Sequence, residues 1–273
     1  YQFPGNLPSG CSSTGANSFS CGSLTLNTID TVTIVNKPAS ISFSGFLTTN
    51  GAKINQGGSA ADLTLTTSGS LSTASGAVVV ANVTTGTLSD TGGATFTGNV
   101  TASGGGSLTV GVGSTVTGNL SSGSGFISLY AHATGNISSS SGAIYLHSDS
   151  IVGGAVSCSC SVYAYDRVAV TGAVSATYFD NGGGTGASFG ATGTTSGTLY
   201  LGTSGTSTGA LSSASGNIFV YSHGTVASSV TTSGDIWIQA DTTVGGTVSG
   251  RSVDASGIGS TFGGAIIGTT GTV

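Results

Sequence analysis

The side chains that could do acid–base chemistry are few in this 273-residue chain, which has nine Asp, no Glu and only four Lys or Arg. The densest cluster is Asp149, Asp166 and Arg167, where carboxylates and a guanidinium lie close in sequence. The histidines are His132, His147 and His223. No second carboxylate recurs at a fixed spacing, and no serine sits in a nucleophile turn. These groups are therefore predicted to be solvated loop charges, with no catalytic residues and no enzymatic activity.

Two short segments could bind a metal ion. Residues 180–186 read Asp-Asn-Gly-Gly-Gly-Thr-Gly and resemble one calcium-binding nonapeptide turn, but such turns bind calcium in series. Cys158 and Cys160 form a Cys-x-Cys pair without further Cys or His ligands nearby, which is a weak zinc signal. We therefore expect no metal and no other cofactor. The two cysteines are interpreted either as a local disulfide or as a pair of small inward side chains.

The composition excludes several function classes. Charged residues make up 5% of the chain and the net charge is −5, so a basic groove for nucleic acid and a polybasic membrane patch are both unsupported. No apolar run reaches the roughly 18 residues that a membrane-spanning helix needs. Short alternating runs of Val, Ile, Leu and Thr are typical of strands, and helix formers are scarce. The chain is predicted to be ordered and rich in β-structure, with neither nucleic acid nor membrane insertion among its interactions.

Two phrases recur with a period near 18 residues. The first is Ser-Gly, or Ser-Cys in one copy, followed by alternating apolar and outward residues, and it begins at 124, 141, 159, 196, 215 and 233. The second is Gly-Asn or a variant, followed by an apolar residue and Ser or Thr, and it begins at 98, 118, 135, 154, 172, 209 and 246. Glycine at these points suits corners where the backbone turns sharply or takes positive φ. Two phrases with one period indicate a solenoid.

The predicted fold is all-β: a parallel β-helix, or β-solenoid, with about 18 residues per coil. Residues 57–273 are predicted to form about 12 coils, roughly 60 Å long at about 4.8 Å per stacked strand. Residues 1–56 lack the repeat and are predicted to form an N-terminal cap or connector. Within it, Cys11 and Cys21 bracket a polar loop and are expected to form a disulfide in an oxidising compartment.

Alternation along each strand assigns side chains to the inside or the outside. One predicted inward column pair contains Ile127, Leu129, Ile144, Leu146, Val162, Ala164, Leu199, Leu201, Ile218, Val220, Ile236 and Ile238. A second inward wall contains Val100, Leu120, Ile137, Val156, Val174, Leu211 and Val248. These side chains are large enough to fill a narrow solenoid, so no interior substrate cavity is expected.

The outward positions are rich in aromatic residues, and we name them the aromatic face. Its members are Tyr130, Tyr145, Tyr163, Tyr165, Tyr200, Phe219, Tyr221 and Trp237. Large apolar patches on a protein surface mark contact sites. Protein–protein packing in a filament or surface layer is the favoured interpretation. Glycan stacking, and lateral pairing that only stabilises neighbouring coils, are the two alternatives.

Several features indicate export. The chain starts at Tyr1 without Met, as expected of a mature form whose signal peptide has been removed. Asn82, Asn99, Asn119 and Asn136 each begin an Asn-x-Ser/Thr sequon. Three of these sequons coincide with the second repeat phrase, so a stacked Asn ladder at a corner explains them without glycan. We expect a secreted protein at the cell surface.

Two parts of the sequence resemble a known family. One part is the N-terminal phrase of residues 3–11 (FPGNLPSGC), 21–26 (CGSLTL) and 30–34 (DTVTI), and the other is residues 51–63 (GAKINQGGSAADL), followed by Thr-Gly-Asn coils. Both are similar to bacterial surface proteins of the MshQ-like type, associated with mannose-sensitive haemagglutinin pilus loci. The later coils also resemble those of polymer-forming surface solenoids. The resemblance implies an exported protein at the surface, and no catalytic residue carries over from it.

The two ends determine how a solenoid assembles, because an uncapped coil leaves backbone and apolar surface unpaired. Residues 262–273 contain no charge, proline or helix signal. We therefore predict head-to-tail assembly of identical subunits into an open filament or layer. The residues predicted at these ends are Tyr1, Phe3, Leu7, Ile266, Ile267 and Val273.

The predicted function is thus that of a structural extracellular protein that is its own partner. The alternative is a carbohydrate-binding surface adhesin that uses the aromatic face to bind surface glycans. An ice-binding solenoid would need a regular Thr-x-Thr array, and the pairs at 64–66 and 115–117 are too scattered for one.

Overall fold

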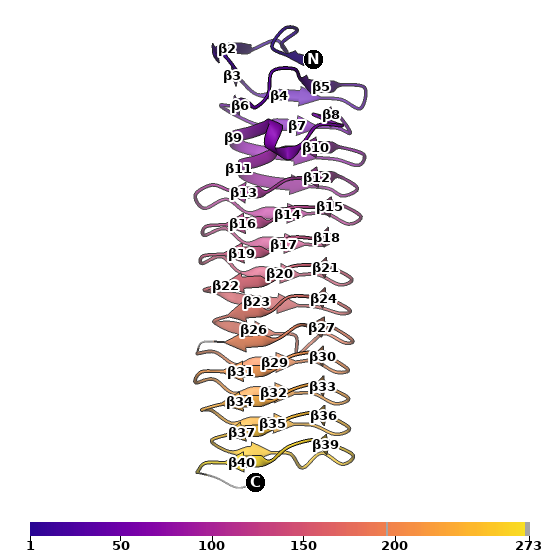
Figure 1. The fold of residues 1–273 in the computed structure, drawn as a ribbon, viewed down its shortest axis with the longest axis vertical. Coiled ribbons are helices and arrows are strands. Elements are labelled where there is room, and N and C mark those ends of the chain that lie inside the picture. Colours follow the sequence, from indigo (N-terminus) through magenta and orange to yellow (C-terminus); the bar gives the residue numbers. More distant parts are fainter. Residues whose placement is uncertain (195, 271–273) are drawn as a thin grey trace. The chain divides into compact units, whose positions relative to one another are not determined.

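The predicted fold class is confirmed by a computed structural model, which describes residues 1–194 and 196–270. The chain is all-β, and its parallel stacked coils of about 18 residues number about 13. It divides into two compact units, Tyr1–Ser139 and Ser140–Val273, each built from such coils (Figure 1). In the described part of the chain, no helix has the length and hydropathy of a membrane span.

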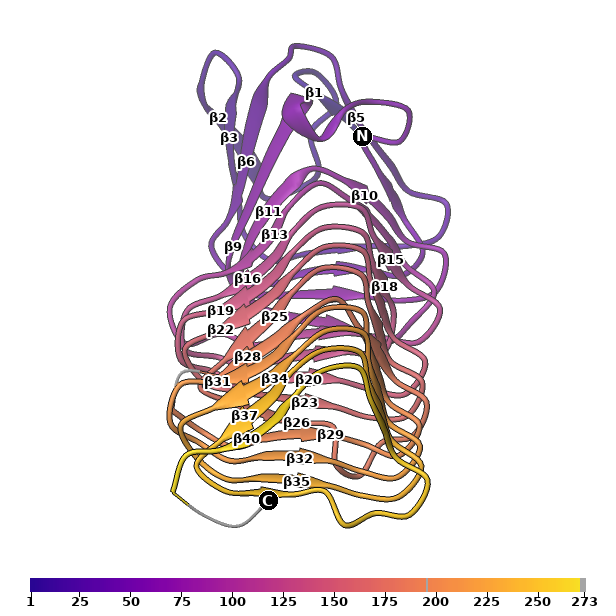
Figure 2. The same cartoon turned by 60° about the horizontal axis from the view of Figure 1, so that its bottom comes forward.

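A coil of the second unit consists of three short strands on three walls. One such coil contains β34 (Val230–Thr232), β35 (Ile236–Ile238) and β36 (Thr243–Val244). Figure 2 shows β34, β37 (Val248–Gly250) and β40 (Ile266–Gly268) on one wall, while β29 (Leu199–Leu201), β32 (Ile218–Val220) and β35 lie on another. Each strand is two or three residues long because the corners interrupt the alternating pattern at those points.

Successive coils stack in register, so like positions fall into columns. Ile218 lies opposite Ile236, and Ile236 opposite Val253, through parallel pairing of β32, β35 and β38 (Val253–Asp254). All the predicted inward residues of both walls are buried, with at most 3% of any side chain exposed. Aliphatic columns of this kind fill the interior. Each coil buries its apolar side chains against the coils stacked next to it, so a single coil could not bury them alone.

The third wall was not predicted from the repeat phrases. In the second unit it includes β33 (Thr225–Val226) and β36, whose Val226 and Val244 are fully buried. These strands are only two residues long, too short for an alternation signal. A recurring Thr-Val dipeptide is the sequence pattern that marks these third-wall strands.

Glycine at the Ser-Gly corners is required by the close approach of coils. A Cβ atom added at Gly216 would overlap the carbonyl oxygen of Gly197, and one added at Gly234 would overlap that of Gly216. None of these three glycines has positive φ, so close approach of the backbones, and not turn conformation, explains this column.

The parallel ladders begin earlier than residue 57, the predicted start of the solenoid. In the first unit, β3 (Ser18–Cys21), β6 (Ala39–Phe43) and β9 (Leu63–Thr73) already pair in parallel. Ser18 lies opposite Ser40, and Ser40 opposite Thr64, which are steps of 22 and 24 residues. From Leu65 to its partner Val83 the step falls to 18. The longer first coils hide the repeat from a search at one fixed period.

The part of the predicted cap that departs from parallel stacking includes β2 (Cys11–Gly15), whereas Gln2 and Phe3 already pair in parallel with β5 (Thr31–Ile34). Strand β2 folds back antiparallel on β3, and the predicted disulfide joins Cys11 to Cys21 across this hairpin. Phe3, on β1 (Gln2–Phe3), is buried and contacts Phe19 edge to face at a ring-centroid distance of 5.0 Å. Phe3 therefore closes the core at this end and is not an exposed assembly residue.

The predicted Asn ladder is present in the first unit. The backbone N–H groups of Asn99, Asn119 and Asn136 donate to the side-chain oxygens of Asn82, Asn99 and Asn119 at 3.1, 3.0 and 2.8 Å. Each amide oxygen thus satisfies a donor of the following coil at a corner where the wall strands cannot pair.

Substituting Gly216 with Ala tests the close approach of coils. We expect Gly216→Ala to destabilise the fold by about 1–3 kcal/mol, because the new methyl group overlaps backbone that cannot move independently. Gly183→Ala is the matched control in the same unit, since a Cβ there meets nothing within 4 Å, and it should change stability by less than about 0.5 kcal/mol. Urea unfolding followed by circular dichroism measures both, and equal effects would contradict the argument.

Candidate functional site

The aromatic face of the second unit lies on the wall formed by β20 (Ile144–Leu146), β23 (Ser161–Ala164), β26 (Tyr178–Asp180), β29, β32 and β35. Tyr145 lies opposite Tyr163, and farther along Tyr200 lies opposite Phe219, which lies opposite Trp237. Register alone places these rings one above another, because each is the outward residue of its strand.

The rings of this face stack on one another. Tyr200 and Phe219 have centroids 4.8 Å apart and planes 8° apart, and Phe219 and Trp237 have centroids 4.5 Å apart and planes 5° apart. Tyr145 and Tyr163 stack at 5.2 Å. All five side chains are half-buried and not fully exposed as the prediction implied, because each ring covers a face of its neighbour. Lateral stabilisation, one of the alternatives, is therefore part of what this face does.

Two residues of this face were missed in the sequence. Asp180 occupies the column position between Tyr163 and Tyr200, so the aromatic column is interrupted there. Tyr178, from the adjacent position of β26, lies 6.0 Å from the rings of both Tyr163 and Tyr200 and bridges the gap. Its hydroxyl donates to the Asp180 carboxylate at 3.1 Å. The gap between the repeat phrases at 159 and 196, which is two periods long, was the signal that could have found them, because it predicts a strand near Tyr178.

Two tyrosines in this region, Tyr178 and Tyr200, resist ionisation. Burial raises the pKa of Tyr178 well above 10.0, and the negative charge of Asp180 raises it further. Burial also raises the pKa of Tyr200, with contributions from Tyr221 and Asp180. These two rings therefore stay neutral at pH 7, which suits stacking better than charged phenolates would.

A second aromatic row lies beside the first. His147 stacks on Tyr165 with centroids 5.2 Å apart, and Tyr221 lies 6.4 Å from Tyr200. Burial lowers the pKa of His147, so its imidazole is neutral at pH 7. Tyr165 is 42% exposed, and Tyr130, in the first unit, is 39% exposed. The second row thus also stacks, and Tyr165 in it is more exposed than the half-buried rings of the first row.

The first row ends at Trp237. The residue opposite Trp237 on β38 is Asp254, a carboxylate and not a ring. Two surface hollows meet at this point, and both are lined by Trp237, Asp254 and Ser256. The N–H of Ser256 donates to Asp254 at 3.1 Å and, with the Ser256 side chain, lowers the pKa of that carboxyl. Asp254 is therefore ionised at neutral pH beside the last ring of the row.

The candidate acid–base cluster forms ion pairs at a corner. Arg167 donates through Nε and a terminal nitrogen to both oxygens of Asp149, at 2.6 and 2.8 Å, and this contact lowers the pKa of Asp149. Asp166 accepts from the backbone and hydroxyl of Thr185. His223 lies 3.7 Å from Asp241. Asp149, Asp166 and Arg167 are thus solvated charges at corners, as the sequence predicted, and His132 lies in the other unit.

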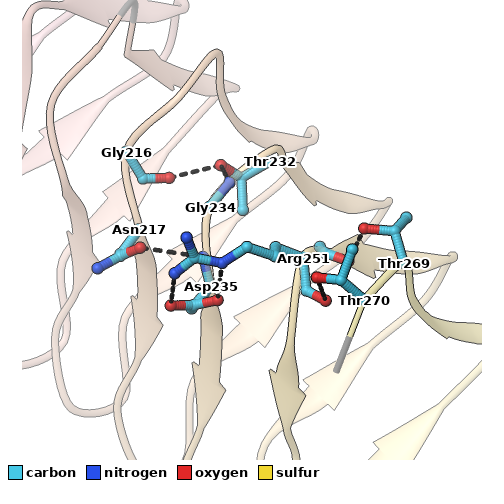
Figure 3. Close-up of polar contacts among 9 residues, drawn as sticks. Gly216, Asn217, Thr232, Gly234, Asp235, Arg251, Thr269 and Thr270 are labelled. Atoms are coloured by element: carbon cyan, nitrogen blue, oxygen red, sulfur yellow. Dashed lines mark hydrogen bonds and ion pairs between the residues drawn. The ribbon is translucent and has the colours of Figure 1, made fainter. Parts of the chain in front are cut away.

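A related ion pair links the coils at the end of the second unit (Figure 3). The Arg251 guanidinium binds both carboxylate oxygens of Asp235, whose own N–H donates to the Asn217 side-chain oxygen at 2.9 Å. The carbonyl of Arg251 accepts from the N–H of Thr270 at 3.2 Å. The Arg251 contact lowers the pKa of Asp235. Polar contacts thus run through successive coils at this corner.

Two buried polar side chains are engaged by the backbone or by hydroxyl groups. Asp90 accepts four hydrogen bonds, from the hydroxyls of Thr73 and Ser114 and from the N–H groups of Gly92 and Gly111. In the calcium-like segment, the amide of Asn181 is fully buried and binds the Ala164 carbonyl and the Gly202 N–H. Within residues 1–194 and 196–270, no three His, Cys, Asp or Glu side chains are grouped to hold a metal ion.

The remaining predicted residues lie as follows. Cys158, on β22 (Val156–Cys158), is paired with Cys160 in the corner that follows. Tyr1 is exposed and Leu7 is half-buried. On β40, Ile266 is half-buried and Ile267 is 45% exposed. Val273 lies outside the described residues.

No protein-family model, no curated protein and no solved structure matches this chain. The geometry above therefore carries the functional argument alone.

A pH titration tests the protonated state of Tyr178. Folding raises the pKa of Tyr178 above its ordinary value of 10.0. The protonated hydroxyl therefore contributes to the free energy of unfolding below pH 10, and this contribution is lost as the pH rises further. Between about pH 8 and about pH 11.5, wild type should lose more stability than Tyr178→Phe, with Asp180→Asn intermediate. Urea unfolding at each pH measures this, and parallel curves for wild type and Tyr178→Phe would refute it.

Proposed function

We propose that this chain is a structural, non-catalytic protein of an extracellular assembly, in which copies join end to end by strand addition. The observation that carries the proposal is the coil of β38, β39 (Thr261–Phe262) and β40 near the end of the described residues. There β38, β39 and β40 each pair with one strand of the preceding coil. Among residues 196–270, no second strand pairs with their other edges.

The chemistry of this open edge favours association. Natural proteins protect exposed strand edges with charge, proline or a covering segment. Strand β40 has the sequence Ile-Ile-Gly, with Ile267 pointing outward. Ile258, in the loop of the same coil, is 88% exposed. Apolar side chains beside unpaired backbone are a template for a further strand.

A second copy of the chain supplies a matching edge. Strand β2, Cys-Ser-Ser-Thr-Gly, is uncharged and pairs on one side with β3, and its residues are exposed except for the half-buried Cys11. Within the described residues, no strand pairs with its other side. Because β2 runs antiparallel to β3, the junction would be an antiparallel pair between β40 of one copy and β2 of the next. Repeated contacts of this heterologous kind build an open filament.

The interior supports a structural role. Aliphatic columns occupy the space inside the coils, and Asp149 and Arg167, two of the charged side chains considered for catalysis, bind each other at a corner. An extracellular location is supported by the Cys11–Cys21 disulfide, because disulfides persist in oxidising compartments. An extracellular location also agrees with the proposed resemblance to exported surface proteins.

Assembly is tested by placing a charge on the open edge. We expect wild type to assemble as its concentration rises from about 1 to about 100 µM, and Ile267→Lys to raise the concentration needed at least about tenfold. Ile151→Lys is the matched control, because Ile151 is similarly exposed, at 41%, on β21 (Ile151–Val152) within the stack. Sedimentation velocity and electron microscopy measure the outcome. A wild type that stays monomeric at the highest concentration, or equal effects of the two substitutions, would sink the proposal.

A further inference from the structure

The last ring of the aromatic row has a different environment from the others. Phe219 covers one face of Trp237, with planes 5° apart. On the other side, the register places Asp254 where a further ring would continue the stack. Tyr200 and Phe219, by contrast, each have an aromatic neighbour on both sides. Trp237 thus has a carboxylate on its second side, whereas the gap that Asp180 leaves between Tyr163 and Tyr200 is filled by the ring of Tyr178.

The surface beside Trp237 is hollowed and polar. One hollow is lined by Phe219, Ser222, Trp237, Ile238, Gln239, Ala240, Asp254, Ser256 and Gly257. The Gln239 side-chain oxygen accepts from the hydroxyl and N–H of Ser222, at 3.1 and 3.3 Å. That contact fixes the amide, whose Nε2 group then supplies donors at the rim. Asp254 is held by Ser256 and supplies carboxylate acceptors on the other side of the ring.

We propose that Trp237 is the stacking platform of a carbohydrate-binding subsite, which takes a neutral pyranose ring. The apolar C–H face of the sugar would lie on the indole, and its hydroxyl groups would bind Asp254 and Gln239. Sites for small molecules combine an apolar surface with a few fixed polar groups that set orientation, and this hollow has both. A carboxylate and an amide together offer the acceptors and donors that vicinal hydroxyl groups require.

The geometry favours a sugar over an organic cation. Quaternary ammonium groups are bound by several rings that surround the charge. Here the rings of Phe219 and Trp237 are parallel and do not surround a space. A ligand would contact one face of Trp237 and the edges of the stacked rings, and no cage is formed. The rim carries serine hydroxyls, an amide and a carboxylate, which match a polyhydroxylated ring.

The site has a direct optical probe, because Trp237 is the only tryptophan in the chain. Its fluorescence should change saturably on titration with cellohexaose or maltohexaose, two neutral pyranose oligomers, up to about 10 mM. Asp254→Asn should weaken this binding about tenfold, because it replaces a charged acceptor. Asp30→Asn, in the other unit, is the matched control and should bind as wild type does.

Titration calorimetry with Trp237→Ala and Trp237→Phe gives a second measurement. The Ala variant should lose binding, whereas Phe should retain part of it as a smaller platform. All titrations use the Ile267→Lys background at low concentration, so that the outcome is independent of assembly. The proposal is overturned if neither oligosaccharide gives a saturable signal, if Asp254→Asn binds as wild type does, or if choline binds in place of the sugars.

Discussion

The in-register stacking of parallel strands is the constraint on which the rest of this structure depends. Each coil repeats the previous one at the strand spacing of a sheet, so equivalent positions of successive coils lie opposite one another and are occupied by similar residue types. The interior columns, the Asn ladder and the aromatic row are all consequences of that one register. The stacked rings lie 4.5 to 5.2 Å apart because this is close to the distance between the paired strands that carry them.

The same constraint selects glycine where the coils bend. At the Ser-Gly corners the backbones of successive coils come so close that a methyl group at Gly216 would overlap the coil before it. Elsewhere the corner takes left-handed φ, and there polar residues occur, as at Asp149, Arg167 and His223. Two of these corner residues, Asp149 and Arg167, are paired by the register one coil apart. The pairing of these two corner charges is thus a consequence of stacking.

Interruptions of a column are where the surface acquires specific chemistry. Asp180 breaks the aromatic row and draws in Tyr178, which repairs the stack from the neighbouring position. Asp254 ends the row and leaves Trp237 beside a carboxylate and a hollow. The last coil has strands paired on one edge, beside exposed Ile258 and Ile267. The proposed sugar subsite arises at one of these interruptions.

The sequence by itself determined the period, the all-β class, two of the three interior walls and the Asn ladder, because each is a pattern of residue types along the chain. It also indicated the Cys11–Cys21 pair and the solvated state of Asp149, Asp166 and Arg167. Only the tertiary structure decided the third wall, whose two-residue strands are too short to show alternation. It alone showed the irregular first coils, the burial of Phe3 and the position of Tyr178. These depend on which residues lie opposite one another, and a register exists only once the coils are stacked.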